Sequence, residues 1–258
     1  LWRKIYVEHA RIMFGMAMLM AVFVAPVQLL IGHAHGENTM HYQPMKVAAM
    51  EGNWERGGNK PLYLFGLPDM QSETTKYGVS IPNGASWILT GKADGVIPGL
   101  KEVAKEDRPP AHIVFWSFRV MVGIGMAMIL TGVMAAILFF CRRLFDFRPF
   151  QLWCMAMMPS GFIAVLAGWF VTEVGRQPYT AYGVIRTGES ISPVIAEQVA
   201  LTHAIFVLVY TLVFGAGSYY ILKLIGKGPK RAQEQEVFYA HSHETAAPQI
   251  PQNETEKE

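Results

Sequence analysis

Residues 114–140 read VFWSFRVMVGIGMAMILTGVMAAILFF and contain a single charged side chain, that of Arg119. A run of about 18 or more apolar residues with almost no charge is long enough to cross the hydrocarbon core of a bilayer as a helix. Three further runs have the same character, over about residues 10–31, 151–171 and 199–222. One such run could be a buried helix of a soluble protein, but four in one chain predict an all-α integral membrane protein.

The composition supports this prediction. Of the 258 residues, 52% are hydrophobic and 16% are charged, and the charges lie between the apolar runs. The net charge of +2 comes without a basic stripe interleaved with aromatic residues, so no nucleic acid is expected as a partner. The two cysteines, Cys141 and Cys154, show no metal-site spacing and no sign of a disulfide.

The apolar runs divide the chain into four parts. We expect a first transmembrane helix within residues 1–31, an outer loop over 32–113, three transmembrane helices within 114–231, and a disordered polar tail over 232–258. Lys and Arg concentrate in three clusters that four crossings bring to one face. The clusters are Arg3, Lys4 and Arg11; Arg142, Arg143 and Arg148; and Lys223, Lys227, Lys230 and Arg231. That face, with the C-terminus, is predicted to be cytoplasmic.

Three groups of residues carry candidate chemistry, and the first is Arg119-Val120-Met121. An arginine within a membrane span is costly and normally has a partner. A methionine can be an axial heme ligand through its thioether sulfur. The ordinary role of any one of the 15 methionines is packing, so the sequence leaves both roles open for Met121.

The second group lies where the third apolar run ends, over residues 168–179, GWFVTEVGRQPY. Glu173 and Arg176 are three residues apart, so on a helix they can form an ion pair. The alternative is that Glu173 ligates iron while Arg176 binds an anionic group such as a heme propionate.

The third group is residues 43–55 of the outer loop, QPMKVAAMEGNWE, where Pro44 predicts the first turn of a short helix. Lys46 can donate a hydrogen bond to a quinone oxygen, and Glu51 can accept a proton from a quinol hydroxyl. The alternative is an ordinary solvated loop helix. His203 is the one histidine within a predicted span, and a structural role is expected for it.

Five motifs in this order resemble subunit I of the cytochrome bd family of quinol oxidases, over nearly the whole chain except its tail. They are QPMKVAAME (43–51) with Trp54-Glu55, FGLPD (65–69), GLKE (99–102), FRVM (118–121) and the segment Gly168–Pro178, which contains the signature GRQP.

The resemblance implies a role for each candidate residue. It makes the outer loop the quinol-oxidising loop, with Lys46 and Glu51 in the quinol site. Met121 would ligate a low-spin heme b, with Arg119 beside it. The second group would serve the oxygen-reducing site: Glu173 at the iron of a high-spin heme b, Trp169 between hemes, and Arg176 as the signature arginine. Electrons would pass from quinol through these hemes to heme d or a third heme b, where oxygen is reduced to water.

The chain also departs from the family pattern. Tyr179 stands where the signature has Trp, and the outer loop is short, as in the cyanide-insensitive branch. The family's N-terminal half, with its histidine heme ligands, is absent. We therefore expect the C-terminal part of a larger helical bundle, inactive alone, with Arg119 and Glu173 uncompensated in lipid.

The partners expected from the resemblance are the missing N-terminal half, oxidase subunit II and a small accessory subunit, in the bacterial inner membrane. The alternative class is a heme-free membrane scaffold or transporter. A transporter would show broken helices or polar residues near the bilayer midplane, and the sequence shows neither.

Overall fold

A computed structural model describes residues 7–191 and 193–228 of the chain. It separates into two compact units, Leu1–Ser192 and Pro193–Glu258. The structure is mostly helical, and four of its helical segments are long and apolar enough to cross a membrane, which confirms the predicted fold class. The predicted disordered tail, 232–258, lies outside the described residues.

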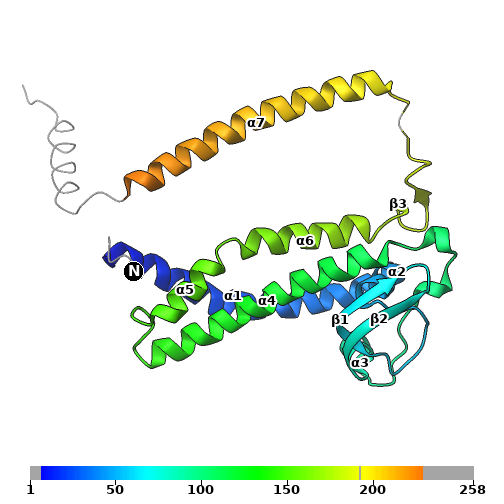
Figure 1. Ribbon diagram of the computed structural model, residues 1–258, viewed down its shortest axis with the longest axis horizontal. Coiled ribbons are helices and arrows are strands. Elements are labelled where there is room, and N and C mark those ends of the chain that lie inside the picture. Colours follow the sequence, from blue (N-terminus) through cyan, green and yellow to red (C-terminus); the bar gives the residue numbers. More distant parts are fainter. Residues whose placement is uncertain (1–6, 192, 229–258) are drawn as a thin grey trace, which may run out of the picture. The chain divides into compact units, whose positions relative to one another are not determined.

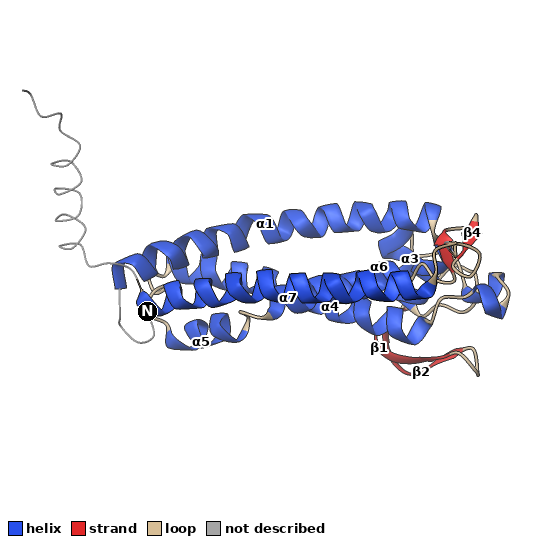
Figure 2. Ribbon diagram, turned by 90° about the horizontal axis from the view of Figure 1, so that it is seen from above, coloured by secondary structure: helices blue, strands red, loops and turns tan. Residues whose placement is uncertain are grey.

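The first unit is a helical bundle with small strands at one end (Figures 1 and 2). Its elements in chain order are α1 (Val7–Tyr42), α2 (Pro44–Glu51), β1 (Leu62–Asp69), β2 (Thr74–Ile81), α3 (Gly84–Thr90), the short 3-10 turns η1 (Leu100–Glu102) and η2 (Lys105–Asp107), α4 (Ala111–Phe140), α5 (Arg148–Ala156), α6 (Ser160–Val174), β3 (Tyr179–Ala181) and β4 (Ile185–Arg186).

Helix α4 is the centre of this unit. It packs against α1 and α6 along its length and against α2 and β1 near its beginning. The crossing with α1 is close at Gly132, where a Cβ would be only 2.7 Å from the carbonyl oxygen of Ala21. Small residues allow membrane helices this approach, which gains van der Waals contact where lipid supplies no hydrophobic drive.

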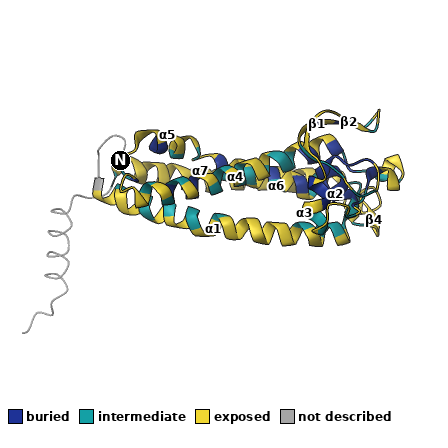
Figure 3. Cartoon of the chain, turned by 90° about the horizontal axis from the view of Figure 1, so that it is seen from below, coloured by how far each residue is buried: buried dark blue, intermediate teal, exposed yellow. Residues whose placement is uncertain are grey.

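Buried residues gather at the two ends of the unit (Figure 3). One cluster forms around α2, and the other joins Phe150 and Leu144 to Phe14 of α1. Between them, many apolar side chains of α1 and α6 remain exposed. That distribution is expected of helices whose outer surface faces lipid or other helices and not water.

Helix α1 is longer than the apolar pattern indicated. It has 36 residues, contains Pro26 within it, and continues past Ile31 to Tyr42. At 1.5 Å per residue it is about 54 Å long, whereas the hydrocarbon core of a bilayer is about 30 Å thick. The segment from Gly32 to Tyr42 therefore extends the helix beyond its apolar part, and α2 follows from that extension.

Two further features differ from the expectations. The third apolar run is interrupted between α5 and α6, because Pro159 has no amide hydrogen to continue the helix. The segment between α2 and α4, which was expected as a loop, also contains an antiparallel hairpin, β1–β2, whose register shifts around Phe65.

The second unit contains α7 (Ala196–Lys227), a single helix of 32 residues. The rings of Phe206, Tyr210 and Phe214 stack along it with centroids 5.9 and 5.5 Å apart. His203 stands one turn before Phe206.

Candidate functional site

Helix α2 begins where Pro44 predicted it would, and it ends at a glycine. Pro44 occupies its first turn, where the missing amide hydrogen costs nothing. Gly52 ends it in the left-handed conformation, with φ of 64°. The amides of Gly52 and Asn53 donate to the carbonyls of Ala49 and Ala48 at 3.2 and 2.9 Å, which closes the last turn.

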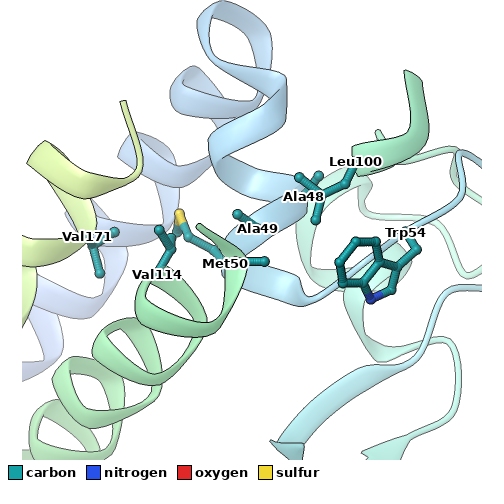
Figure 4. Close-up of a cluster of buried hydrophobic side chains, with 8 residues drawn as sticks. Ala48, Ala49, Met50, Trp54, Leu100, Val114 and Val171 are labelled. Atoms are coloured by element: carbon teal, nitrogen blue, oxygen red, sulfur yellow. The ribbon is translucent and has the colours of Figure 1, made fainter. Parts of the chain in front are cut away.

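Every residue of α2 from Met45 to Glu51 is buried. Figure 4 shows Ala48, Ala49 and Met50 packed together with Val114 of α4 and Val171 of α6. The alternative of a solvated loop helix is therefore wrong. The helix is enclosed at one end of the bundle, and its two charged side chains are enclosed with it.

Glu51 pairs with Arg119 of α4. A guanidinium nitrogen of Arg119 donates to the Glu51 carboxylate at 2.9 Å, and the two side chains are only 11% and 7% exposed. The Nε of Arg119 donates to the carbonyl of Tyr63 at 2.6 Å, and the guanidinium lies 4.5 Å from the ring centre of Phe115. Burial raises the pKa of Glu51 and Arg119 opposes that rise. A buried pair of this kind is costly to break, because the remaining charge has no water.

Lys46 lies at the other side of α2, toward the end of α6. Its aliphatic stem packs on Gly175, where a Cβ would be 3.0 Å from the Lys46 Cγ. Burial and the nearby Arg176 guanidinium lower the pKa of Lys46, while Glu173 acts in the opposite direction. The quinol-site candidates on α2 thus adjoin both of the other predicted groups.

Glu173 and Arg176 form the ion pair expected from their spacing. Both side chains are partly exposed, at 43% for Glu173 and 37% for Arg176. The Nε of Arg176 is nevertheless buried, and it has no hydrogen-bond partner among the residues that the structure describes. Such an orphaned donor is costly unless an acceptor reaches it, so the geometry leaves a place for an anionic oxygen beside the pair.

Met121 faces α6. A Cβ at Gly168 would be 3.1 Å from the Met121 sulfur, so the thioether lies against the backbone of that helix. Trp169, the next residue of α6, is 61% exposed and contacts Phe170. Arg119 and Met121 stand two residues apart on α4 and point to different neighbours, α2 and α6.

The structure therefore brings the predicted residues to one end of the first unit and corrects one expectation. Arg119 and Glu173 are not uncompensated, because each has an ion-pair partner within the chain. His203 belongs to the second unit, so the structure does not tie it to this end.

The donor set fits heme iron only in part. Among residues 7–191 and 193–228, no group of three or more His, Cys, Asp and Glu is arranged to hold a metal ion. Met121 and Glu173 are each a single donor of a type that iron accepts. The unpaired Nε of Arg176 suits a carboxylate such as a propionate.

Three residues at this end were not found from the sequence. Tyr63 acts through its backbone carbonyl, so no side-chain signal could indicate it. Thr75 of β2 donates to the Gly52 carbonyl and accepts from Trp54. Asp107 accepts from Tyr179 at 3.1 Å and from Arg186 at 2.6 Å, which joins the loop before α4 to the hairpin after α6. The sequence indicated Asp107 only through its position in the charged run KEDR, residues 105–108, where ion pairs are common.

Comparisons with known proteins agree on one family. Residues 1–229 match the family of cytochrome bd terminal oxidase subunit I. The chain is 30% identical over 235 residues to cytochrome bd ubiquinol oxidase subunit 1 of Bacillus subtilis (strain 168), covering 87% of this chain and 50% of that protein. It is 24% identical over 274 residues to cytochrome bd-II ubiquinol oxidase subunit 1 of Escherichia coli (strain K12), covering 81% and 53%.

The fold has a solved counterpart as well. The structure of bd oxidase from Geobacillus thermodenitrificans is similar with a TM-score of 0.66 and 26% identity, covering 87% of this chain and 56% of that one. The chain spans about half the length of the curated relatives it matches.

Proposed function

The chain belongs to the cytochrome bd terminal oxidase subunit I family, and on that basis we propose that it is part of a terminal oxidase that oxidises quinol and reduces oxygen to water. The observation that supports this most is the buried Glu51–Arg119 pair, two residues along α4 from Met121. The proton acceptor on α2 and the candidate iron ligand Met121 on α4 are thus connected through Arg119, which lies two residues before Met121 on α4.

Glu51 is proposed to accept the proton that quinol loses on oxidation. Oxidation of a quinol to a quinone releases two electrons and two protons, so the site needs a base. A carboxylate at its ordinary pKa is a weak base near neutral pH, and the raised pKa of Glu51 brings it closer to the range in which general bases work. Arg119 keeps the ionised carboxylate in place before the proton arrives.

Lys46 is proposed to donate a hydrogen bond to the second oxygen of the quinol ring. The residue is only 7% exposed as a whole, and in the described residues its ammonium has no hydrogen-bond or ion-pair partner. A mostly buried ammonium gains from an acceptor, and a quinone oxygen would supply one.

Met121 is proposed to hold the iron of a low-spin heme b, and Glu173 that of a high-spin heme b. Arg176 would bind a propionate through its unpaired Nε, and Trp169 would lie between hemes. The hemes, when bound, accept the electrons of quinol and reduce oxygen, with heme d or a third heme b at the oxygen site. Because each donor in this chain is single, the remaining iron ligands would come from the portion of the relatives that this chain does not span.

The assembly is proposed to include that remaining portion and oxidase subunit II, with a small accessory subunit as a further candidate. The four apolar helices and the family make the chain a multi-pass membrane protein. We place it in the bacterial inner membrane, with α2 and the β1–β2 hairpin on the outer side and the C-terminus in the cytoplasm.

The test uses the complete oxidase that contains this chain. Glu51→Gln keeps the size of the side chain and removes the proton acceptor, so quinol-driven oxygen uptake should fall about 100-fold while the heme spectrum stays. Glu55→Gln is the matched control, because Glu55 is 69% exposed and pairs only at the surface with Lys101. Wild-type uptake in Glu51→Gln would show that the site is not where quinol is oxidised.

A further inference from the structure

The β1–β2 hairpin contacts Arg119 and also Gly52, the residue that follows Glu51. The carbonyl of Tyr63, on β1, accepts from Arg119 Nε at 2.6 Å. Thr75, on β2, donates its hydroxyl to the carbonyl of Gly52 at 2.8 Å. Gly52 directly follows Glu51, so the hairpin fixes the guanidinium from one strand and the end of α2 from the other.

Both the hydroxyl and the methyl group of Thr75 contact neighbouring residues. Its oxygen also accepts from the indole nitrogen of Trp54 at 3.1 Å. Its methyl group lies beside Gly66, where a Cβ would be 2.8 Å from it. In the described part of the chain, neither the Gly52 carbonyl nor the Trp54 indole has another hydrogen-bond partner. One hydroxyl therefore satisfies an acceptor and a donor that lie one and three residues after Glu51 in the sequence.

The far end of the hairpin is anchored as well. Glu73 accepts from Arg108 at 2.9 Å and pairs with Lys105 at 3.1 Å. The Arg108 side chain is only 8% exposed, and its Nε donates to the carbonyl of Val103. Arg108 lies just before α4, so these contacts join the hairpin to the segment that leads into the helix that carries Arg119.

We propose that Thr75 is a positioning residue for quinol oxidation. It holds the C-terminal turn of α2 so that the Glu51 carboxylate faces Arg119. Without the hydroxyl, the Gly52 carbonyl and the Trp54 indole lose their hydrogen-bond partner at a partly buried position. They can regain hydrogen bonds only if that turn moves or if water enters. Either change displaces Glu51. The inference rests on the proposed role of Glu51 as the proton acceptor.

The experiment compares three substitutions in the complete oxidase. Thr75→Val keeps the shape and removes the hydroxyl, Thr75→Ser keeps the hydroxyl, and Thr74→Val makes the same chemical change at the exposed neighbouring residue. Turnover and KM for a short-chain quinol are measured per heme, and amide hydrogen exchange is measured for the peptide that spans residues 48–54.

Thr75→Val should raise the quinol KM about tenfold, a change of 1.4 kcal/mol at that ratio, and should speed exchange in the 48–54 peptide. Thr75→Ser should restore both to within about twofold of the wild type, and Thr74→Val should change neither. Trp54→Phe removes the indole donor together with part of the buried ring, and leaves the hydrogen bond from Thr75 to Gly52 in place. It should act in the same direction by a smaller factor, which provides a second variant if Thr75→Val does not assemble.

Glu51→Gln separates the failure of this inference from the failure of the proposed function. If Glu51→Gln slows turnover but neither Thr75→Val nor Trp54→Phe changes KM or exchange, Thr75 has no positioning role and the function stands. If Glu51→Gln leaves turnover unchanged, the proposed function fails, and this inference fails with it. If both the proposed function and this inference are correct, adding Thr75→Val to Glu51→Gln should slow turnover little further, because the two substitutions act on one step.

Discussion

The sulfur of Met121 on α4 lies against Gly168 on α6, so closely that a Cβ at position 168 would be 3.1 Å from it. This distance is shorter than ordinary van der Waals contact. The thioether therefore has its place because residue 168 lacks a side chain. If Met121 ligates iron, the position of its sulfur is set by its contact with α6, although the residue belongs to α4.

Gly168→Ala should disturb the low-spin heme without unfolding the chain. Alanine is more favourable than glycine within a helix by about 1 kcal/mol, so the substitution should not destabilise α6 itself. The added methyl group would push the Met121 sulfur aside, and the low-spin absorption should weaken or shift. An optical spectrum of the purified oxidase measures this.

Gly161→Ala is the matched control on the same helix. A Cβ there would be 4.0 Å from the Met128 side chain, which is ordinary contact. Its spectrum should equal that of the wild type. Equal disturbance by both alanines would point to a general effect on α6 and not to Met121.

Met121→Leu should convert the low-spin heme to high spin or release it, because leucine keeps the volume of the side chain and offers no sulfur lone pair. The other hemes should remain. Met126→Leu, at an exposed position five residues along α4, serves as the control and should leave the spectrum unchanged. A wild-type spectrum in Met121→Leu would remove this residue from the heme ligands.

Glu173→Gln distinguishes a heme role from a simple ion pair. A partly exposed pair such as Glu173–Arg176 contributes about 0–1 kcal/mol, so loss of the pair alone predicts a small change in Tm and normal spectra. A heme role predicts loss of the high-spin signals and of oxygen reduction, with quinol binding preserved. Glu189→Gln, at an exposed residue after β4, is the control for removing one carboxylate.

The acid limb of quinol turnover should reflect Glu51. Burial raises its pKa above the ordinary value of 4.5, and a proton acceptor works only when deprotonated, so turnover should rise with pH through that raised pKa. In the same window the folded chain holds this proton more strongly than the unfolded chain. The contribution of Glu51 to stability therefore decreases as pH rises through it.

A pH–rate profile of kcat/KM checks this prediction. The wild-type acid limb should be missing from the residual activity of Glu51→Gln and present in Glu55→Gln. An acid limb that persists unchanged in Glu51→Gln would assign the titration to another group.

Sequence patterns were sufficient for the features that depend on local order. Four long apolar runs predicted four membrane-spanning segments. Pro44 predicted the start of α2, and the spacing of Glu173 and Arg176 predicted their pair. Each of these depends on residues close together in the chain, so the pattern contains the information.

The rest depends on contacts between distant segments. Glu51 and Arg119 are 68 residues apart, and no local signal pairs them. The β1–β2 hairpin lies within residues 32–113, which were expected as a loop, and its strand β1 contains Gly66 and Pro68, residues that are uncommon within strands. The length of α1 was underestimated because its polar end, after Ile31, was excluded by a criterion based on apolarity alone.

The interval between Arg119 and Met121 has a consequence for how this gene can vary. At about 100° per residue, two residues separate the directions of these side chains by about 200° around α4. A substitution at Val120 leaves that angle as it is. An inserted or deleted codon between them would rotate one side chain by about 100° relative to the other. Either the contact of Arg119 with α2 or the contact of Met121 with α6 would then be lost. Divergent relatives are therefore free to change the residue between them, and the reading frame between them should keep its length.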